Sequence, residues 1–158
     1  MRRLTEIEIS LADIVKEAAT KSWLAGETRA KDDENAYNIE LNADDENTPM
    51  CVRYALNALD NVALTFAGYN ATIASSATDE YSSTVDDTIT LSLRLPANFD
   101  FTLTQTLATL IHHYVVDWCL IEWYTSVKPD EVSIYTTDLE ITRQKLIQII
   151  TKRQKPIR

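Results

Sequence analysis

The residues best suited to acid–base chemistry are the only two histidines of the chain, His112 and His113. Neighbouring residues on a helix point about 100° apart, so these two rings cannot hold one metal ion together. His113 and Asp117 are four residues apart, which places them on one helix face and makes a catalytic dyad geometrically possible. No serine is placed to act as its nucleophile, and Cys51 or Cys119 would serve only if folding brought one of them close. Structural roles are therefore expected for both histidines.

The cysteines and the acidic segments do not have the spacing of metal ligands. Cys51 and Cys119 are far apart, without a CxxC motif, and are expected to be buried free thiols. Residues 32–35 and 44–47 both read DDEN, but neither has the glycine or the closing glutamate of a calcium loop. The chain has only two glycines, too few for a phosphate loop or a nucleophile elbow. The sequence predicts no enzyme activity, no metal and no cofactor.

Charge is divided unevenly along the chain. The formal net charge is -9, yet the residues after Glu140 hold six cations and no acid, so residues 1–140 carry -15. The strip that closes the sequence supplies five candidate docking residues: Lys152, Arg153, Lys155, Pro156 and Arg158. Cations in the last turn of a helix favour the negative end of its dipole, which accounts for the first two. Proline prevents the helix from continuing. Residues 152–158 are therefore predicted to form a basic tail that docks on acidic protein surface.

Apolar residues at spacings of three and four predict about four helices. The first covers residues 5–26, with Thr5 and Glu8 as a capping box, and the second covers residues 48–68, with proline in its first turn. The third, over residues 103–125, is interrupted by polar residues and is expected to be a buried central helix and not a membrane span. The fourth, from Pro129 to about residue 151, follows a short turn and should pack antiparallel to the third.

One segment alternates apolar and polar residues, "TITLSLRLP" at residues 88–96, and predicts a half-buried strand ended by proline. An isolated strand leaves its backbone groups unpaired. The partner is expected to be residues 70–75 or 81–85 in a hairpin, or a neighbouring subunit. Three of its residues are candidates for docking by strand addition: Ile89, Leu91 and Leu93.

The 158 residues are expected to form one domain, because a chain of this length buries roughly 70% of its extended surface. The predicted fold is mainly α with a small β element. It is a bundle of about four helices, with a strand or β-hairpin arm between the second and third helices. Residues 68–88 are expected to be a flexible loop or arm.

The order of these segments resembles the head-tail connector, or head-completion adaptor, proteins of tailed bacteriophages and Bacteroidetes prophages. The resemblance covers "AATKSWLAGETR", "DDENAYNIELNADDEN", "ITLSLRLP" and the stretch from "VVDWCLIEWYTSVKPDE" to "KRQKPIR". The matching positions in that last stretch are Trp118, Trp123, Lys128, Pro129, Tyr135, Arg153, Pro156 and Arg158.

The resemblance implies a structural virion protein that forms a ring under the portal and extends the DNA channel to the tail. Its partners would be the portal protein, neighbouring neck or tail proteins and its own copies. It would reside in the neck of the virion, and in the host cytoplasm during assembly, with no membrane and no cofactor. An acidic body suits a channel that passes DNA without binding it specifically.

Three alternatives stay open. One is another neck component, such as a tail-completion or tail-terminator protein. A second is a small nucleic-acid-binding assembly module that uses the basic tail. The aromatic residues Trp118, Trp123 and Tyr124 do not support it, because no lysine or arginine lies among them, and core packing and subunit contact are expected for them. The third is a hydrolase built around His113 and Asp117.

Overall fold

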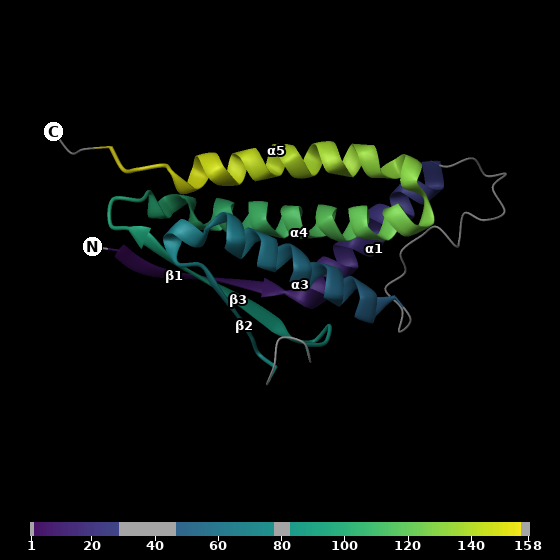
Figure 1. The fold of residues 1–158 in the computed structure, drawn as a ribbon, viewed down its shortest axis with the longest axis horizontal. Helices are drawn as coiled ribbons and strands as arrows, with labels where there is room; N and C mark the ends of the chain where they lie inside the picture. Colours follow the sequence, from purple (N-terminus) through teal and green to yellow (C-terminus); the bar gives the residue numbers. More distant parts are fainter. Residues whose placement is uncertain (1, 29–46, 78–82, 156–158) are drawn as a thin grey trace.

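The computed structural model describes residues 2–28, 47–77 and 83–155 (Figure 1). The chain is mainly α-helical with a small antiparallel sheet, as predicted. The elements are β1 (Arg2–Ser10), α1 (Leu11–Thr28), α3 (Thr48–Thr65), η1 (Ala67–Tyr69), β2 (Thr72–Ser75), β3 (Thr88–Pro96), η3 (Phe101–Leu103), α4 (Thr104–Val127), η4 (Pro129–Glu131) and α5 (Val132–Ile150). None of the described helices is long and apolar enough to cross a membrane.

The start of the chain is a strand, so the helix predicted from residue 5 was wrong in its first turns. Ile7 and Ile9 are buried, whereas the glutamates at positions 6 and 8 are exposed, which is the two-residue period of a half-buried strand. All nine residues of β1 pair antiparallel with β3. Pairing with β3 satisfies backbone groups that an isolated first helical turn would leave free, and this long-range contact outweighs the local capping box.

Helix α1 begins at Leu11, and its cap is Ser10 instead of the predicted threonine. The Ser10 Oγ accepts the backbone N–H of Asp13 at 3.4 Å, which satisfies one free donor of the first turn. The helix continues two residues past Gly26. The second predicted helix is confirmed as α3, with proline in its first turn.

The sheet has the order β1-β3-β2, so β3 is its central strand. Thr72–Ser75 is one of the predicted partners and pairs with β3 within the same chain. The other predicted partner, residues 81–85, lies partly outside the described residues and forms no strand in the part described. The three proposed docking residues of β3 are fully buried: Ile89, Leu91 and Leu93. Their side chains belong to the core. β1 pairs with the whole of one edge of β3, and β2 pairs with residues 89–92 along the other edge.

Helix α4 is the centre of the molecule, as predicted. Helix α5 covers one side of it, and α1, α3 and the sheet lie on the other (Figure 1). Because α4 is covered on both sides, it is apolar nearly all round, and residues from every face of it are buried. The short turn Pro129–Glu131 joins α4 to α5, which packs back along it.

The predicted arm at residues 68–88 contains η1, β2 and a tight turn before β3. Asp87 holds that turn together. Its Oδ2 accepts the Thr84 backbone N–H at 2.6 Å, and its Oδ1 accepts the Ser76 hydroxyl at 2.9 Å. These hydrogen bonds, led by the one from the Thr84 backbone, lower the pKa of the Asp87 carboxyl. The described part of the arm is therefore tied to the sheet.

Candidate functional site

Both histidines face one carboxylate on the neighbouring helix. The Nε2 atom of His112 contacts Oε2 of Glu17, and Nδ1 of His113 lies 3.8 Å from Oε1 of the same side chain. Helices α1 and α4 bring these groups together because they pack side by side. The arrangement joins two helices, which fits the structural role predicted for the histidines.

The predicted dyad partner of His113 has another main contact. Asp117 lies 3.6 Å from Lys21 Nζ, and the residue is only 4% exposed. Burial raises the pKa of the Asp117 carboxyl, and the charge of Lys21 opposes that rise. His113 contributes a weaker favourable charge. The carboxylate therefore belongs to a second ion pair between α1 and α4.

The two cysteines meet in the core, although 68 residues separate them. The Cys119 thiol donates to the Cys51 carbonyl at 3.7 Å, and both residues are fully buried and free, as predicted. A hydrogen bond with the Cys51 thiol and burial raise the pKa of Cys119. A buried, protonated thiol is a poor nucleophile and a poor metal ligand.

No group of three histidine, cysteine or acidic side chains that could hold a metal ion occurs within residues 2–28, 47–77 and 83–155. The acidic segments at residues 32–35 and 44–46 lie outside that part of the chain.

The aromatic residues of α4 pack the core, as expected. Tyr124 is fully buried and stacks on Tyr135 of α5, with ring centroids 5.5 Å apart. The Tyr114 hydroxyl donates to Asn61 Oδ1 of α3 at 2.7 Å. Aromatic contacts therefore fix α4 to both α3 and α5.

The basic segment predicted as a free tail is attached to the molecule over its first residues. The backbone N–H of Gln154 donates to the Asn98 carbonyl at 2.8 Å, and that of Asp100 donates to the Lys152 carbonyl at 3.3 Å. Arg153 forms a β-bridge within this pairing. Its guanidinium donates to the carbonyls of Ile150 and Lys152, both at 3.0 Å, and so caps α5. The helix-terminal role predicted for Arg153 is confirmed.

The same end of the molecule receives the start of β1 and the end of β3. Arg2 lies opposite Pro96, and Leu4 lies opposite Arg94. The Arg3 guanidinium lies 4.5 Å from the centre of the Phe101 ring, a cation–π contact next to the bridged segment. We call this surface the basic end; its six cations are Arg2, Arg3, Arg94, Lys152, Arg153 and Lys155.

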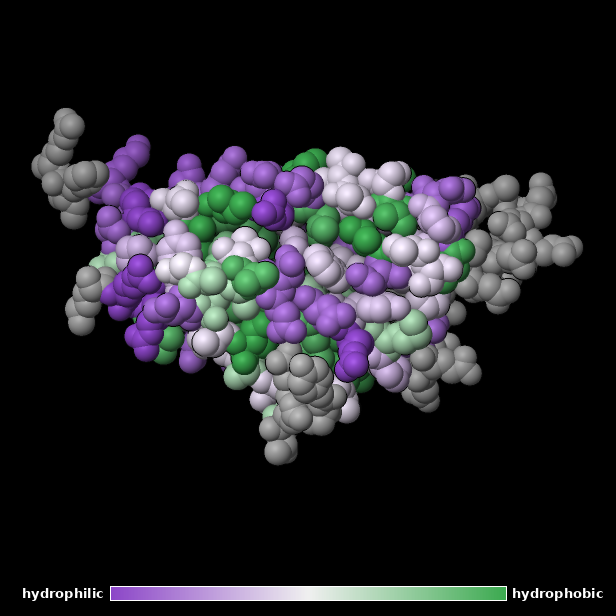
Figure 2. Space-filling model, in the orientation of Figure 1, coloured by the Kyte–Doolittle hydropathy of each residue, from purple (hydrophilic) through white to green (hydrophobic). Residues whose placement is uncertain are grey.

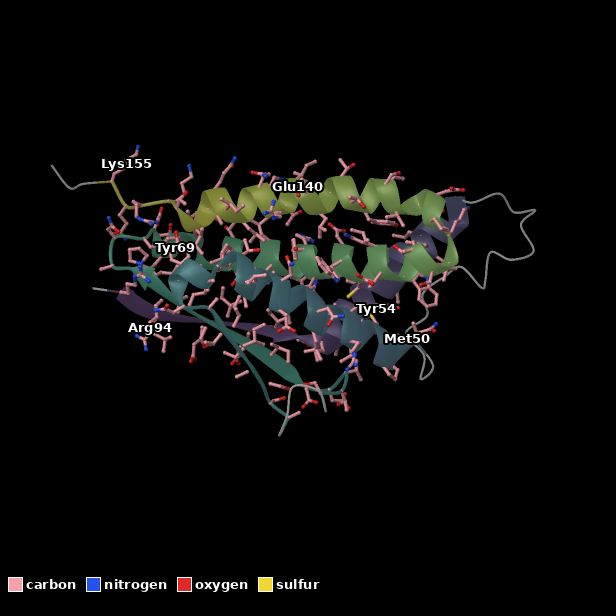
Figure 3. All side chains as sticks on the ribbon, in the orientation of Figure 1. Met50, Tyr54, Tyr69, Arg94, Glu140 and Lys155 are labelled. Carbon is pink, nitrogen blue, oxygen red and sulfur yellow. The ribbon has the colours of Figure 1, made fainter. Side chains whose placement is uncertain are left out.

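All six cations of the basic end are exposed. Figure 3 shows Arg94 and Lys155 at the same end of the long axis, and Figure 2 shows hydrophilic side chains gathered there. Within the described residues, Arg94, Lys152 and Lys155 form no ion pair. Asp100 is the acidic residue next to these cations. Its Oδ1 accepts hydrogen bonds from the backbone N–H and the hydroxyl of Thr102 and forms no ion pair with the cations of the basic end.

Sequence reasoning found half of this surface. It proposed Lys152, Arg153 and Lys155, whereas Pro156 and Arg158 lie outside the described residues. It missed the arginines of β1 and β3 because their proximity follows from the antiparallel register, which was not recognised. The alternation over residues 5–10 was the available signal.

A groove of about 410 Å³ lies where β1 ends, α1 begins and one face of α4 passes. We call it the β1 groove. Its lining is mostly polar and includes Glu8, Ser10, Asp13, Gln105, Thr109 and His112. Glu17 is the carboxylate that His112 contacts, so a third acid stands at its border. The groove thus has the opposite charge to the basic end.

No protein-family model, curated protein or solved structure matches this chain. The basic end and the β1 groove are defined by the residues of this chain alone.

Proposed function

We propose that this chain is a structural virion protein of a tailed bacteriophage, a head-tail connector that forms a ring under the portal and extends the DNA channel to the tail. The basic end is its docking surface. The portal protein, neighbouring neck proteins and other copies of the chain are its partners, and the neck of the virion is its location.

The observation that carries this proposal is the gathering of cations from three distant segments at one end of an acidic protein. Residues 2–3, Arg94 and residues 152–155 come together only in the folded chain. None of the six cations has an ion-pair partner among the described residues, so their charges are available to an external surface. Complementary charges guide two protein surfaces toward each other and fix their relative orientation. The assembly of a ring requires both.

The fold agrees with what the resemblance implies, a small helical bundle with a strand element. The acidic remainder of the chain also suits a channel through which DNA passes, because carboxylates repel the phosphate backbone. These features support the proposal independently of the basic end.

Binding to isolated portal rings tests the docking role. We expect the wild type to co-sediment with portal at low salt, and the double variant Arg94→Glu, Lys155→Glu to lose at least about tenfold in affinity, since rim charges mainly govern encounter. Lys145→Glu on the exposed face of α5 makes the same kind of charge change outside the basic end and should bind normally. Equal binding by the double variant would contradict the proposal.

The same cations favour a second candidate, a nucleic-acid-binding assembly module. That function requires duplex DNA affinity that falls with salt, with a logarithmic slope of about -0.9 per neutralised phosphate. An acidic chain with cations at one end is expected to show no such binding at physiological salt. DNA binding that is lost in the Arg94→Glu, Lys155→Glu variant would favour the module over the connector.

A further inference from the structure

The β1 groove adjoins a free strand edge. β1 is the outer strand of the sheet, and within the described residues no backbone hydrogen bond reaches its outer edge from another segment. An unpaired edge of nine residues offers backbone donors and acceptors to a partner. The groove lies at the end of this edge, between Ser10 and the α4 face that carries Gln105 and Thr109. Strand edge and groove together form a place where another chain can lie.

Charge limits what that chain can be. Glu8 and Asp13 line the groove, are exposed and have no ion-pair partner among the described residues. Glu17 lies one helical turn after Asp13 in α1 and is shared by the two histidines. A partner that places cations on Glu8 and Asp13 is favoured, and one that brings carboxylates is repelled.

We propose that the β1 groove receives the basic end of a second copy of this chain. Arg94 of the incoming copy pairs with Glu8 and Asp13 of the receiving copy, which leaves Lys152 and Lys155 of the basic end for the portal. The inference rests on the proposed function, because it names the contact by which the connector would form its ring. The incoming surface is supplied by this chain itself, which carries unpaired cations at one end and unpaired carboxylates at the groove.

The contact has a defined symmetry. The basic end lies at one end of the long axis, where β1 starts, whereas the groove is where β1 ends (Figure 1). The two surfaces are different, so the interface is heterologous: the receiving copy keeps a free basic end, and the incoming copy keeps a free groove. Repetition of such a contact closes a ring when the rotation per copy allows it. The bridged segment from Lys152 to Gln154 also has a second backbone edge, which can meet the edge of β1.

Two complementary variants of the full chain test this contact. The groove variant carries Glu8→Arg and Asp13→Asn, and the end variant carries Arg94→Glu and Lys155→Glu. Sedimentation velocity at low salt measures their self-association, and circular dichroism verifies that each is folded. The matched controls are Asp60→Arg on α3 and Lys145→Glu on α5, both exposed and outside the two surfaces.

The wild type and both controls are expected to associate as concentration rises, whereas each variant alone loses at least about tenfold in self-affinity. An equimolar mixture of the two variants retains one intact groove and one intact basic end, and the two altered surfaces also carry opposite charges, so the mixture should recover the association that each variant alone has lost. If the wild type does not associate at concentrations up to about 1 mM, its free energy of self-association is weaker than about -4 kcal/mol. That result would overturn the inference. Variants that associate like the wild type, or a mixture that stays monomeric, would overturn it too.

The two proposals fail in different ways. Loss of portal binding in the end variant, together with a wild type that never self-associates, would retain the connector and reject this contact. Self-association that follows the expected pattern, with portal binding unaffected, would retain the contact and reject the docking role.

Discussion

Asp117 of α4 and Lys21 of α1 form an ion pair with 3.6 Å between Oδ1 and Nζ, and it is markedly asymmetric in burial. The carboxylate side chain is 6% exposed, whereas the lysine side chain is 37% exposed. Lysine thus reaches from the surface to a carboxylate that lies within the helix interface, with its stem along apolar surface. The pair joins two helices, and next to it Glu17 joins the same helices through the histidines.

Replacing Lys21 with methionine should destabilise the protein. The substitution keeps the stem but leaves the buried carboxylate without its cation. Removing one partner of a fully buried pair costs about 3–5 kcal/mol; because Lys21 is partly exposed and screened by water, we expect about 1–3 kcal/mol. Urea denaturation measures the change. Lys16→Met on the exposed face of the same helix should cost less than about 0.5 kcal/mol, and an equal loss in both variants would show that the ion pair is not the cause.

The free energy of unfolding should depend on pH through the protonation of the Asp117 carboxyl. Burial raises the pKa of this carboxyl in the folded state, so the folded chain takes up its proton before the unfolded chain does as pH falls. The wild type should therefore gain stability relative to Asp117→Asn as pH falls from 7 towards about 4, near the ordinary pKa of an aspartate, and should lose that gain as pH rises through the raised pKa. Urea melts at stepped pH measure this difference. A difference that is independent of pH would contradict the burial of an ionised Asp117.

Ile7 tests the strand at the start of the chain. Its side chain is 3% exposed in β1, so Ile7→Ala should destabilise the protein by about 2–4 kcal/mol through lost burial and a cavity. Leu4 lies on the open face of the same strand and is 51% exposed, and Leu4→Ala should cost less than about 0.5 kcal/mol. Thermal or urea unfolding distinguishes the two. Similar losses at both positions would mean that the alternation of β1 is wrong.

The two cysteines should be inert in the folded state. Both are fully buried, and the pKa of Cys119 is raised, so a thiol reagent in the absence of denaturant should label neither residue on the timescale of minutes. Addition of urea should release both for labelling, and mass spectrometry counts the labels. Rapid labelling of Cys119 in the native protein would be inconsistent with its place between α3 and α4.

The sequence predicted the helices best because their signal is local. Spacings of three and four fix α3, α4 and α5, and the turn at Pro129 fixes the antiparallel pair. The first segment was misread because Ile7 and Leu11 fit a helical spacing as well as Ile7 and Ile9 fit a strand. Only the long-range pairing with β3 decides between these readings.

The basic end was harder to predict than the helices, because part of it is formed by long-range pairing and not by a local pattern. The cations at residues 152–155 are contiguous and visible in the sequence, and they did mark the basic end. Arg2, Arg3 and Arg94 join them through strand register, and the backbone bond from Gln154 to Asn98 holds the C-terminal segment in place; neither leaves a local pattern in the sequence. The sequence left the partner of β3 open between a hairpin and a neighbouring subunit; strands of the same chain pair with it on both sides, and Ile89, Leu91 and Leu93 are buried.

The composition of purified phage particles is the measurement that most directly tests whether the basic end is the docking surface of a connector. Wild type, Lys145→Glu and the double variant Arg94→Glu, Lys155→Glu are each supplied to an infection that lacks the native copy, and quantitative mass spectrometry counts the chain relative to the portal protein. Wild type and Lys145→Glu should be present in a fixed ratio to portal, whereas the double variant should be folded in the cell yet reduced by at least about tenfold in particles, in line with its loss of charge complementarity. Full incorporation of the double variant, or absence of the wild type from particles, would contradict the proposed function.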